Sequence, residues 1–147
     1  MQRIRNELAA KRRKARHYGV QALYKWYMIG GDPGEIVLEF CDEYDFINVD
    51  VEYFSNLLYS ISSQVEDLEA VLLPILDRKL DELDPIERSV LRLGTFELKK
   101  RPDIPYKVVI SESVALAKKF GATDSHRYIN GVLDKVARLL RSDEMVS

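Results

Sequence analysis

Apolar residues recur every three or four positions along most of this 147-residue chain. The clearest run lies between residues 51 and 75, where the apolar positions are Val51, Phe54, Leu58, Ile61, Val65, Leu68, Val71 and Ile75. This spacing predicts one apolar face of a helix or of two joined helices, and Pro74 predicts a kink or break near its end. No segment shows the polar–apolar alternation of a half-buried strand. We therefore expect an all-α fold with about six or seven helices.

Capping residues divide this helical pattern into segments. A first helix is expected over about residues 9–29, because Gly30-Gly31 follows it and glycine commonly ends helices. Residues 32–35 and 84–87 both contain the pattern Asp-Pro-x-Glu, which places an N-cap aspartate before a proline at the first helical position. Two further helices are expected, one over about residues 106–120 and one from about residue 124.

The formal net charge is only −2, but the charge is unevenly distributed along the chain. Residues 1–31 carry +7, residues 32–87 carry −14 and residues 88–147 carry +5. The near-neutral total argues against indiscriminate binding to polyanions. Two basic ends would nevertheless form a local polyanion site if they met in space.

The composition also argues against several classes of protein. Cys41 is the single cysteine, so an internal disulfide is excluded, and the two histidines, His17 and His126, lack metal-ligand spacing. The sequence contains no glycine-rich phosphate loop. Its apolar runs are too short to span a membrane, and its basic N-terminus does not lead into the apolar stretch of a secretory signal. We therefore expect a cytoplasmic protein that is not an enzyme, with no catalytic residues, cofactor or metal.

The first candidate binding feature is the basic stretch at residues 11–16, which opens an amphipathic helix. Arginine forks bind two phosphate oxygens, and cations on a rigid helix lose less entropy on binding than cations on a loose tail. The alternative interpretation is a solvated, partly frayed N-terminus.

The second candidate feature is the segment 124–131, at the expected start of the last helix. Helix N-termini offer free N–H groups to anions, Tyr128 could stack on an unpaired base, and Asn130 could contact a base edge or the backbone. The alternative is ordinary capping by Asp124, with Tyr128 half-buried in the core.

These residues resemble the NusB family of bacterial transcription antitermination factors. The resemblance rests on four stretches, at residues 12–24, 91–98, 103–110 and 117–134. It implies an all-helical fold of two small bundles, an N-terminal one over about residues 9–80 and a C-terminal one over about residues 84–141.

NusB-like proteins bind the boxA element of nascent RNA as a heterodimer with NusE, a protein of the small ribosomal subunit. The complex helps load antitermination factors onto RNA polymerase, notably on ribosomal RNA operons, and the resemblance implies the same partners here. The RNA-facing residues that it implies are Arg12, Arg13, Arg16, Asp124, Ser125, Arg127, Tyr128 and Asn130. The NusE-facing residues that it implies are Tyr24, Glu87 and Arg92. Self-association of the free protein, as a homodimer, is left open.

Two other functions are weighed against this one. A NusB-like domain also begins some ribosomal RNA cytosine methyltransferases, but those enzymes add a cofactor-binding domain with catalytic cysteines, whereas Cys41 is the single cysteine here. A protein–protein adaptor that does not contact RNA is the second alternative.

Overall fold

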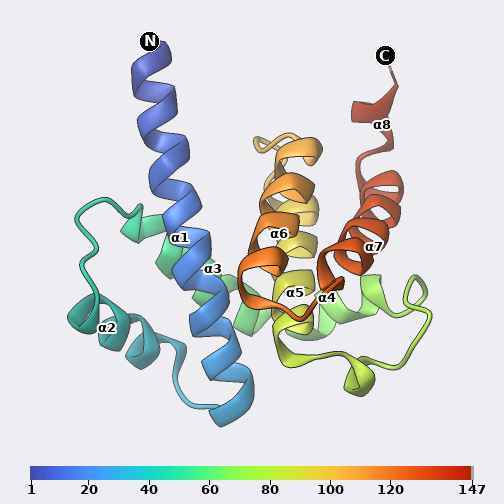
Figure 1. Cartoon of the computed structure of the whole chain (residues 1–147), viewed down its shortest axis with the longest axis horizontal. Coiled ribbons are helices and arrows are strands. Elements are labelled where there is room, and N and C mark those ends of the chain that lie inside the picture. The colour runs from blue at the N-terminus through green and yellow to red at the C-terminus, as the bar shows by residue number, and fades with distance from the viewer. Residues whose placement is uncertain (147) are drawn as a thin grey trace. The chain divides into compact units, whose positions relative to one another are not determined.

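The computed structural model describes residues 1–146, and all of its regular elements are helical. Figure 1 shows their order along the chain. The elements are α1 (Gln2–Ile29), α2 (Pro33–Glu43), α3 (Val51–Ser63), α4 (Val65–Leu72), the 3₁₀ turn η1 (Leu80–Glu82), α5 (Pro85–Lys100), α6 (Tyr106–Phe120), α7 (Ser125–Leu140) and the short α8 (Ser142–Met145). The predicted all-α class is confirmed. None of the helices within these residues is long and apolar enough to cross a membrane.

The first unit comprises residues 1–63, in which α1, α2 and α3 pack against one another. Its core includes Leu23 of α1, Phe40 of α2 and Phe54 of α3. The rings of Phe46 and Phe54 meet edge to face, with centroids 5.0 Å apart, so the loop after α2 is packed onto this core. That packing fixes the path of the chain into α3.

Helix α1 begins at Gln2, not near residue 9 as expected. The first ten residues are exposed, and Arg3 pairs with Glu7 one turn later at 3.3 Å. Helix formers fill this segment and neither proline nor glycine interrupts it, so the packed part of the helix propagates outward. Figure 1 shows these first turns extending beyond α2 and α3.

The second unit begins at Gln64, and α5 lies at its centre. Every residue from Ser89 to Leu98 of α5 is buried, because α4, α6 and α7 all pack against this helix. Gly94 permits a close approach to α7: a Cβ atom at this position would lie 2.7 Å from Leu133 Cδ1.

The boundary between the units differs from the expected one near residues 80–84. The apolar run of residues 51–75 forms two helices that break at Gln64, and α4 packs with α5 and α7. Leu68 and Leu72 bury the apolar face of α4 in this second unit, which is why α4 leaves the first unit.

Local capping follows the sequence closely at two helix starts. The backbone N–H of Ile86 donates to Asp84 Oδ1 at 2.7 Å, and the Asp84 N–H donates to Glu87 Oε1 at 3.3 Å, so the predicted capping box forms. Asp32 likewise accepts a hydrogen bond from the Gly34 N–H at 3.0 Å.

Arg141 joins the end of α7 to the end of α5. Its buried guanidinium donates to the carbonyl oxygens of Leu98, Ile104, Glu97 and Arg101 at 2.8–3.1 Å. Carbonyls at a helix C-terminus lack intrahelical partners, so a buried arginine satisfies them.

Candidate nucleic-acid interface

The basic stretch of α1 lies beside the start of α3. Asp50 caps α3 by accepting a hydrogen bond from the Tyr53 N–H at 3.0 Å, and the Asp50 N–H donates to the Lys11 carbonyl at 3.2 Å. Its other carboxylate oxygen lies 3.6 Å from Arg12 Nε. Asp50 therefore fixes α3 and the basic turn of α1 against each other.

Tyr53 lies under two of the expected arginines. The guanidinium carbon of Arg12 is 5.2 Å from the ring centroid and that of Arg16 is 5.6 Å from it. Arg16 is only 4% exposed, Arg12 is half-buried, and Arg13 is exposed between the exposed Lys11 and Lys14. The three arginines expected to act alike thus have different surroundings, and the outward-facing charge is centred on Arg13.

The start of α7 does not have the expected aspartate cap. Asp124 has a left-handed backbone with φ of 69°, and its side chain makes no cap hydrogen bond. It instead lies 3.7 Å from Arg127 Nε, in a pair whose side chains are 67% and 79% exposed. Ser125 is buried against the turn that follows Gly121, whereas Arg127 and Asn130 are exposed.

Tyr128 is half-buried, and the loop after α4 holds it on two sides. The guanidinium carbon of Arg78 lies 4.0 Å from the ring centroid, and the phenol donates to Asp77 Oδ1 at 3.2 Å. Partial burial and this hydrogen bond raise the pKa of Tyr128. Hydrogen bonds from Arg78 and then Tyr128 hold the pKa of Asp77 below its usual value. The ring is neither a core residue nor a bare stacking surface.

Asp77 and Arg78 were not among the residues predicted from the sequence. One signal could have found them: Arg78 and Lys79 are the only two cations in the otherwise acidic segment 32–87. In the structure the first of these two cations, Arg78, contacts the Tyr128 ring.

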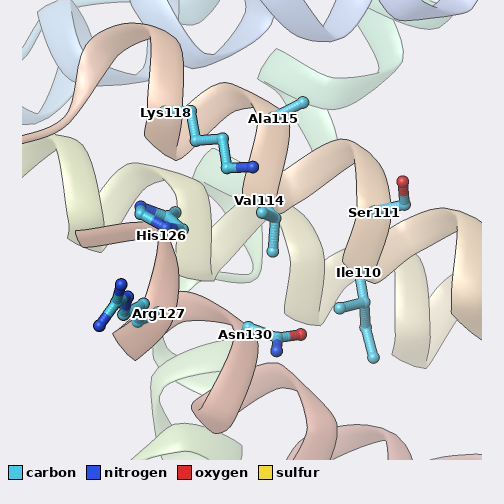
Figure 2. A pocket seen from close by; sticks show the side chains of 8 residues that line it. All are labelled: Ile110, Ser111, Val114, Ala115, Lys118, His126, Arg127 and Asn130. Carbon is cyan, nitrogen blue, oxygen red and sulfur yellow. The ribbon is translucent and has the colours of Figure 1, made fainter. Parts of the chain in front are cut away.

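Two hollows flank the first turns of α7. The larger, the α6/α7 cleft, has a volume of about 530 Å³ and is lined by Ile110, Ser111, Val114, Ala115, Lys118, His126, Arg127 and Asn130. Figure 2 shows that α6 and α7 each supply one wall of this cleft. The smaller, the Tyr128 cleft, has a volume of about 200 Å³ and is lined by Ile75, Asp77, Arg127, Tyr128, Gly131, Val132 and Lys135. Arg127 lines both.

The residues expected to meet a protein partner are also unlike one another. Tyr24 is exposed on α1, whereas Glu87 is nearly buried in the capping box of α5. Arg92 is 4% exposed and donates to Glu69 Oε2 through Nε at 3.1 Å and Nη2 at 3.0 Å. Arg88 donates to both oxygens of the same carboxylate at 2.8 and 3.2 Å. Arg92 therefore joins α4 to α5 in a charged network.

The model of the NusB family matches residues 13–138. The chain belongs to the NusB family. It is 52% identical over 133 residues to the transcription antitermination protein NusB of Alcanivorax borkumensis, covering 90% of this chain and 89% of that one. It is 50% identical over 137 residues to the protein of the same name from Pseudomonas savastanoi pv. phaseolicola, covering 93% and 83%.

Solved structures of NusB proteins have the same fold. The structure of T. maritima NusB matches with a TM-score of 0.80 and 28% identity, covering 90% of this chain and 95% of that one. A crystal structure of the antitermination factors NusB and NusE in complex with dsRNA matches with a TM-score of 0.79 and 29% identity, covering 86% and 96%. The resemblance seen in the sequence is confirmed. The relatives named above are transcription antitermination proteins.

Proposed function

We propose that this chain is a cytoplasmic transcription antitermination factor that binds the boxA element of nascent RNA, notably of ribosomal RNA operons, as a heterodimer with NusE. The heterodimer on boxA would help assemble the antitermination complex on RNA polymerase. The observation that carries this proposal is the match over 86% of the chain to a NusB protein solved together with NusE and RNA.

The basic turn of α1 supports the RNA contact. Arg13 is proposed to bind a phosphate, because an exposed guanidinium on a rigid helix suits that contact. The half-buried Arg12 is proposed to bind a second phosphate through the part of its side chain that stays accessible. Arg16 is proposed to act indirectly. Its guanidinium packs on the Tyr53 ring, as that of Arg12 does, so it helps to position Arg12. Arg16 thereby holds Arg12 and this face of α1 in place on α3.

The start of α7 supports a second group of RNA contacts. Arg127 and Asn130 are exposed and able to reach a phosphate and a base edge. Tyr128 is proposed to stack on a base through ring surface that Arg78 leaves uncovered. Asp124 and Ser125 are proposed to shape the turn, Asp124 by holding Arg127 and Ser125 by its burial.

The proposed NusE contacts lie at Tyr24 and Glu87. Arg92 follows Glu87 along α5 and is buried. Glu87 offers a carboxylate to a basic side chain of NusE, and Tyr24 offers exposed aromatic surface. Arg92, held by Glu69, is proposed to keep the start of α5 in place. A homodimer through these surfaces is proposed for the protein without its partners.

The proposal is tested by titrating a single-stranded boxA-like RNA with the protein, with and without NusE, against a scrambled RNA of the same length. We expect NusE to raise the affinity for boxA and to leave the scrambled RNA weakly bound. Equal binding of the two RNAs in the presence of NusE would contradict the boxA proposal, and absence of binding to either would contradict RNA binding itself. Sedimentation of the free protein over a concentration series tests the homodimer.

A further inference from the structure

The α6/α7 cleft has a chemical character that differs from the rest of the surface around it. Its lining includes two cations, Lys118 from α6 and Arg127 from α7, together with His126. None of the described residues that line it is acidic. Arg127 forms an ion pair with Asp124 in which both side chains are largely exposed. Exposed ion pairs contribute little to stability, so the Arg127 guanidinium can bind a phosphate in place of Asp124. The cleft therefore suits a negatively charged group.

The inner surface of the same cleft is apolar. Ile110, Val114 and Ala115 lie along one face of α6, and Figure 2 shows Val114 and Ile110 in the space between the two helices. Ser111 and Asn130 add a hydroxyl and a carboxamide, which can donate to and accept from the edge of a base or a ribose hydroxyl. An apolar surface with a few polar groups and cations at one side is the pattern of a small-ligand site, and about 530 Å³ is a usual volume for one.

We propose that the α6/α7 cleft binds one nucleotide that the RNA turns out of its stack. The phosphate meets Lys118 and Arg127, the face of the base lies on Val114 and Ile110, and Asn130 contacts the base edge. This inference rests on the proposed RNA-binding function and adds to it a site whose α6 residues belong to none of the contacts described above.

The position of Arg127 connects this cleft with Tyr128. Arg127 lines both the α6/α7 cleft and the Tyr128 cleft, so it stands between them at the start of α7. A strand with one base on Tyr128 and the next nucleotide in the α6/α7 cleft has its intervening phosphate near the Arg127 guanidinium. Arginine is well suited to that position because its fork binds two phosphate oxygens at once.

The test compares two neighbouring lysines of α6. Lys118 lines the cleft, whereas Lys119, equal in charge and also exposed, does not. With NusE present, Lys118→Ala should weaken boxA binding about tenfold, as expected for one charge-assisted contact. It should also reduce the slope of log K against log salt by about 0.7. Lys119→Ala should leave the boxA affinity and the salt slope equal to those of the wild type within experimental error. Equal effects of the two variants would mean that only the general positive field matters, and would overturn the proposal.

A second arm tests the base. Ala115→Leu narrows the cleft at an exposed position without changing the charge, and RNAs that lack one base at a time locate the bound nucleotide. In the wild type two adjacent abasic positions should weaken binding more than the others, one for the base on Tyr128 and one for the base in the α6/α7 cleft, and in Ala115→Leu only the second effect should disappear. The same profile of abasic effects in both proteins would overturn the proposal, even if RNA binding itself is intact.

Two further outcomes separate other occupants from an RNA nucleotide. Uridine monophosphate alone should bind only at millimolar concentration, and micromolar binding would identify a free nucleotide as the ligand instead. Loss of NusE affinity in Lys118→Ala or Ala115→Leu, with RNA affinity unchanged, would assign the cleft to a protein contact. If the wild type binds no RNA, the proposed function fails and this inference fails with it. If the wild type binds boxA but the cleft variants behave normally, only the inference fails.

Discussion

The guanidinium of Arg78 lies over the ring of Tyr128, with its central carbon 4.0 Å from the ring centroid. The adjacent Asp77 accepts a hydrogen bond from the hydroxyl of the same ring. Two consecutive loop residues therefore hold an aromatic side chain of α7 by its face and by its polar end. The ring is oriented before any ligand arrives, which lowers the entropy cost of stacking a base on it.

Truncation of the Tyr128 ring should separate its role in RNA binding from its role in stability. Tyr128→Ala should weaken RNA binding about tenfold, since stacking contributes ~1–3 kcal/mol per base. The loss of unfolding free energy should be smaller than the ~3–5 kcal/mol of a fully buried aromatic, because the ring is half-buried. Tyr128→Phe keeps the ring and its contact with Arg78 but loses the hydrogen bond to Asp77, so it should bind RNA more tightly than Tyr128→Ala. Chemical denaturation and RNA titration measure the two effects, and a large loss of stability with unchanged RNA affinity would exclude stacking.

Arg13 and Arg16 should respond differently to the same substitution. Arg13→Ala should change the unfolding free energy by less than ~0.5 kcal/mol, as at other exposed sites. It should also lower the salt slope of RNA binding by about 0.7. Arg16→Ala removes a buried cation from the Tyr53 ring and should cost ~1–2 kcal/mol of stability. A salt slope reduced equally by both variants would show that Arg16 also reaches a phosphate.

A single substitution should separate the capping role of Glu87 from its proposed contact with NusE. Glu87→Gln keeps an oxygen that accepts the Asp84 N–H, so stability should hardly change, whereas loss of the charge should weaken NusE binding. Glu69→Ala is the contrasting variant: it leaves Arg88 and Arg92 without their shared carboxylate and should cost ~3–5 kcal/mol. Calorimetric titration with NusE measures the first effect. Equal NusE affinity of Glu87→Gln and the wild type would leave Glu87 with its capping role alone.

The two helix-interior glycines of the second unit should respond to alanine with opposite sign. Gly94→Ala places a Cβ 2.7 Å from Leu133 Cδ1 and 3.0 Å from Ser113 Oγ, and since both neighbours are buried it should destabilise by ~1–3 kcal/mol. Gly131→Ala meets no atom within 4 Å, so its better helix propensity should stabilise by up to ~1 kcal/mol. Denaturation midpoints of the two variants check this directly. Destabilisation by Gly131→Ala would point to a conformational demand at that site.

Stability should fall in acid partly through Glu144. This carboxylate accepts the Tyr106 N–H at 2.7 Å and pairs with Arg141 at 2.6 Å, and the Tyr106 bond, followed by Arg141, lowers its pKa. A group whose pKa is lower in the folded state stabilises above the ordinary glutamate pKa of about 4.3, and this contribution is lost as the pH falls through the lowered value.

Glu144→Gln should therefore melt below the wild type at pH 6, and the two should converge on acidification below the ordinary glutamate pKa. Asp143→Asn removes one negative charge at the neighbouring residue and is the matched control for the change in net charge. A constant difference between Glu144→Gln and the wild type from pH 6 to pH 3 would remove Glu144 from the acid response.

Features that depend on a few neighbouring residues could be predicted from the sequence. Three such features are the capping box of Asp84 and Glu87, the helix end before Gly30 and the all-α class, since each depends on backbone groups that pair within one or two turns. The family resemblance added the family itself, which the comparisons confirm, whereas the site residues that it implied stay predictions. The start of α1 and the side-chain cap at Asp124 were wrong in detail, because helix propagation and the left-handed backbone at Asp124 depend on surrounding structure.

The surroundings of the charged side chains were decided by the tertiary structure alone. Arg12, Arg13 and Arg16 are equivalent in the sequence, yet only the packing of Tyr53 under α1 makes Arg16 a buried residue and leaves Arg13 exposed. Arg78 and Tyr128 lie far apart in the chain and meet because α4 packs with α5 and α7. Periodicity and capping specify which face of a helix is apolar, since those interactions are local. Which cation meets which ring or carboxylate depends on contacts between distant segments, and these exist only once the helices have packed.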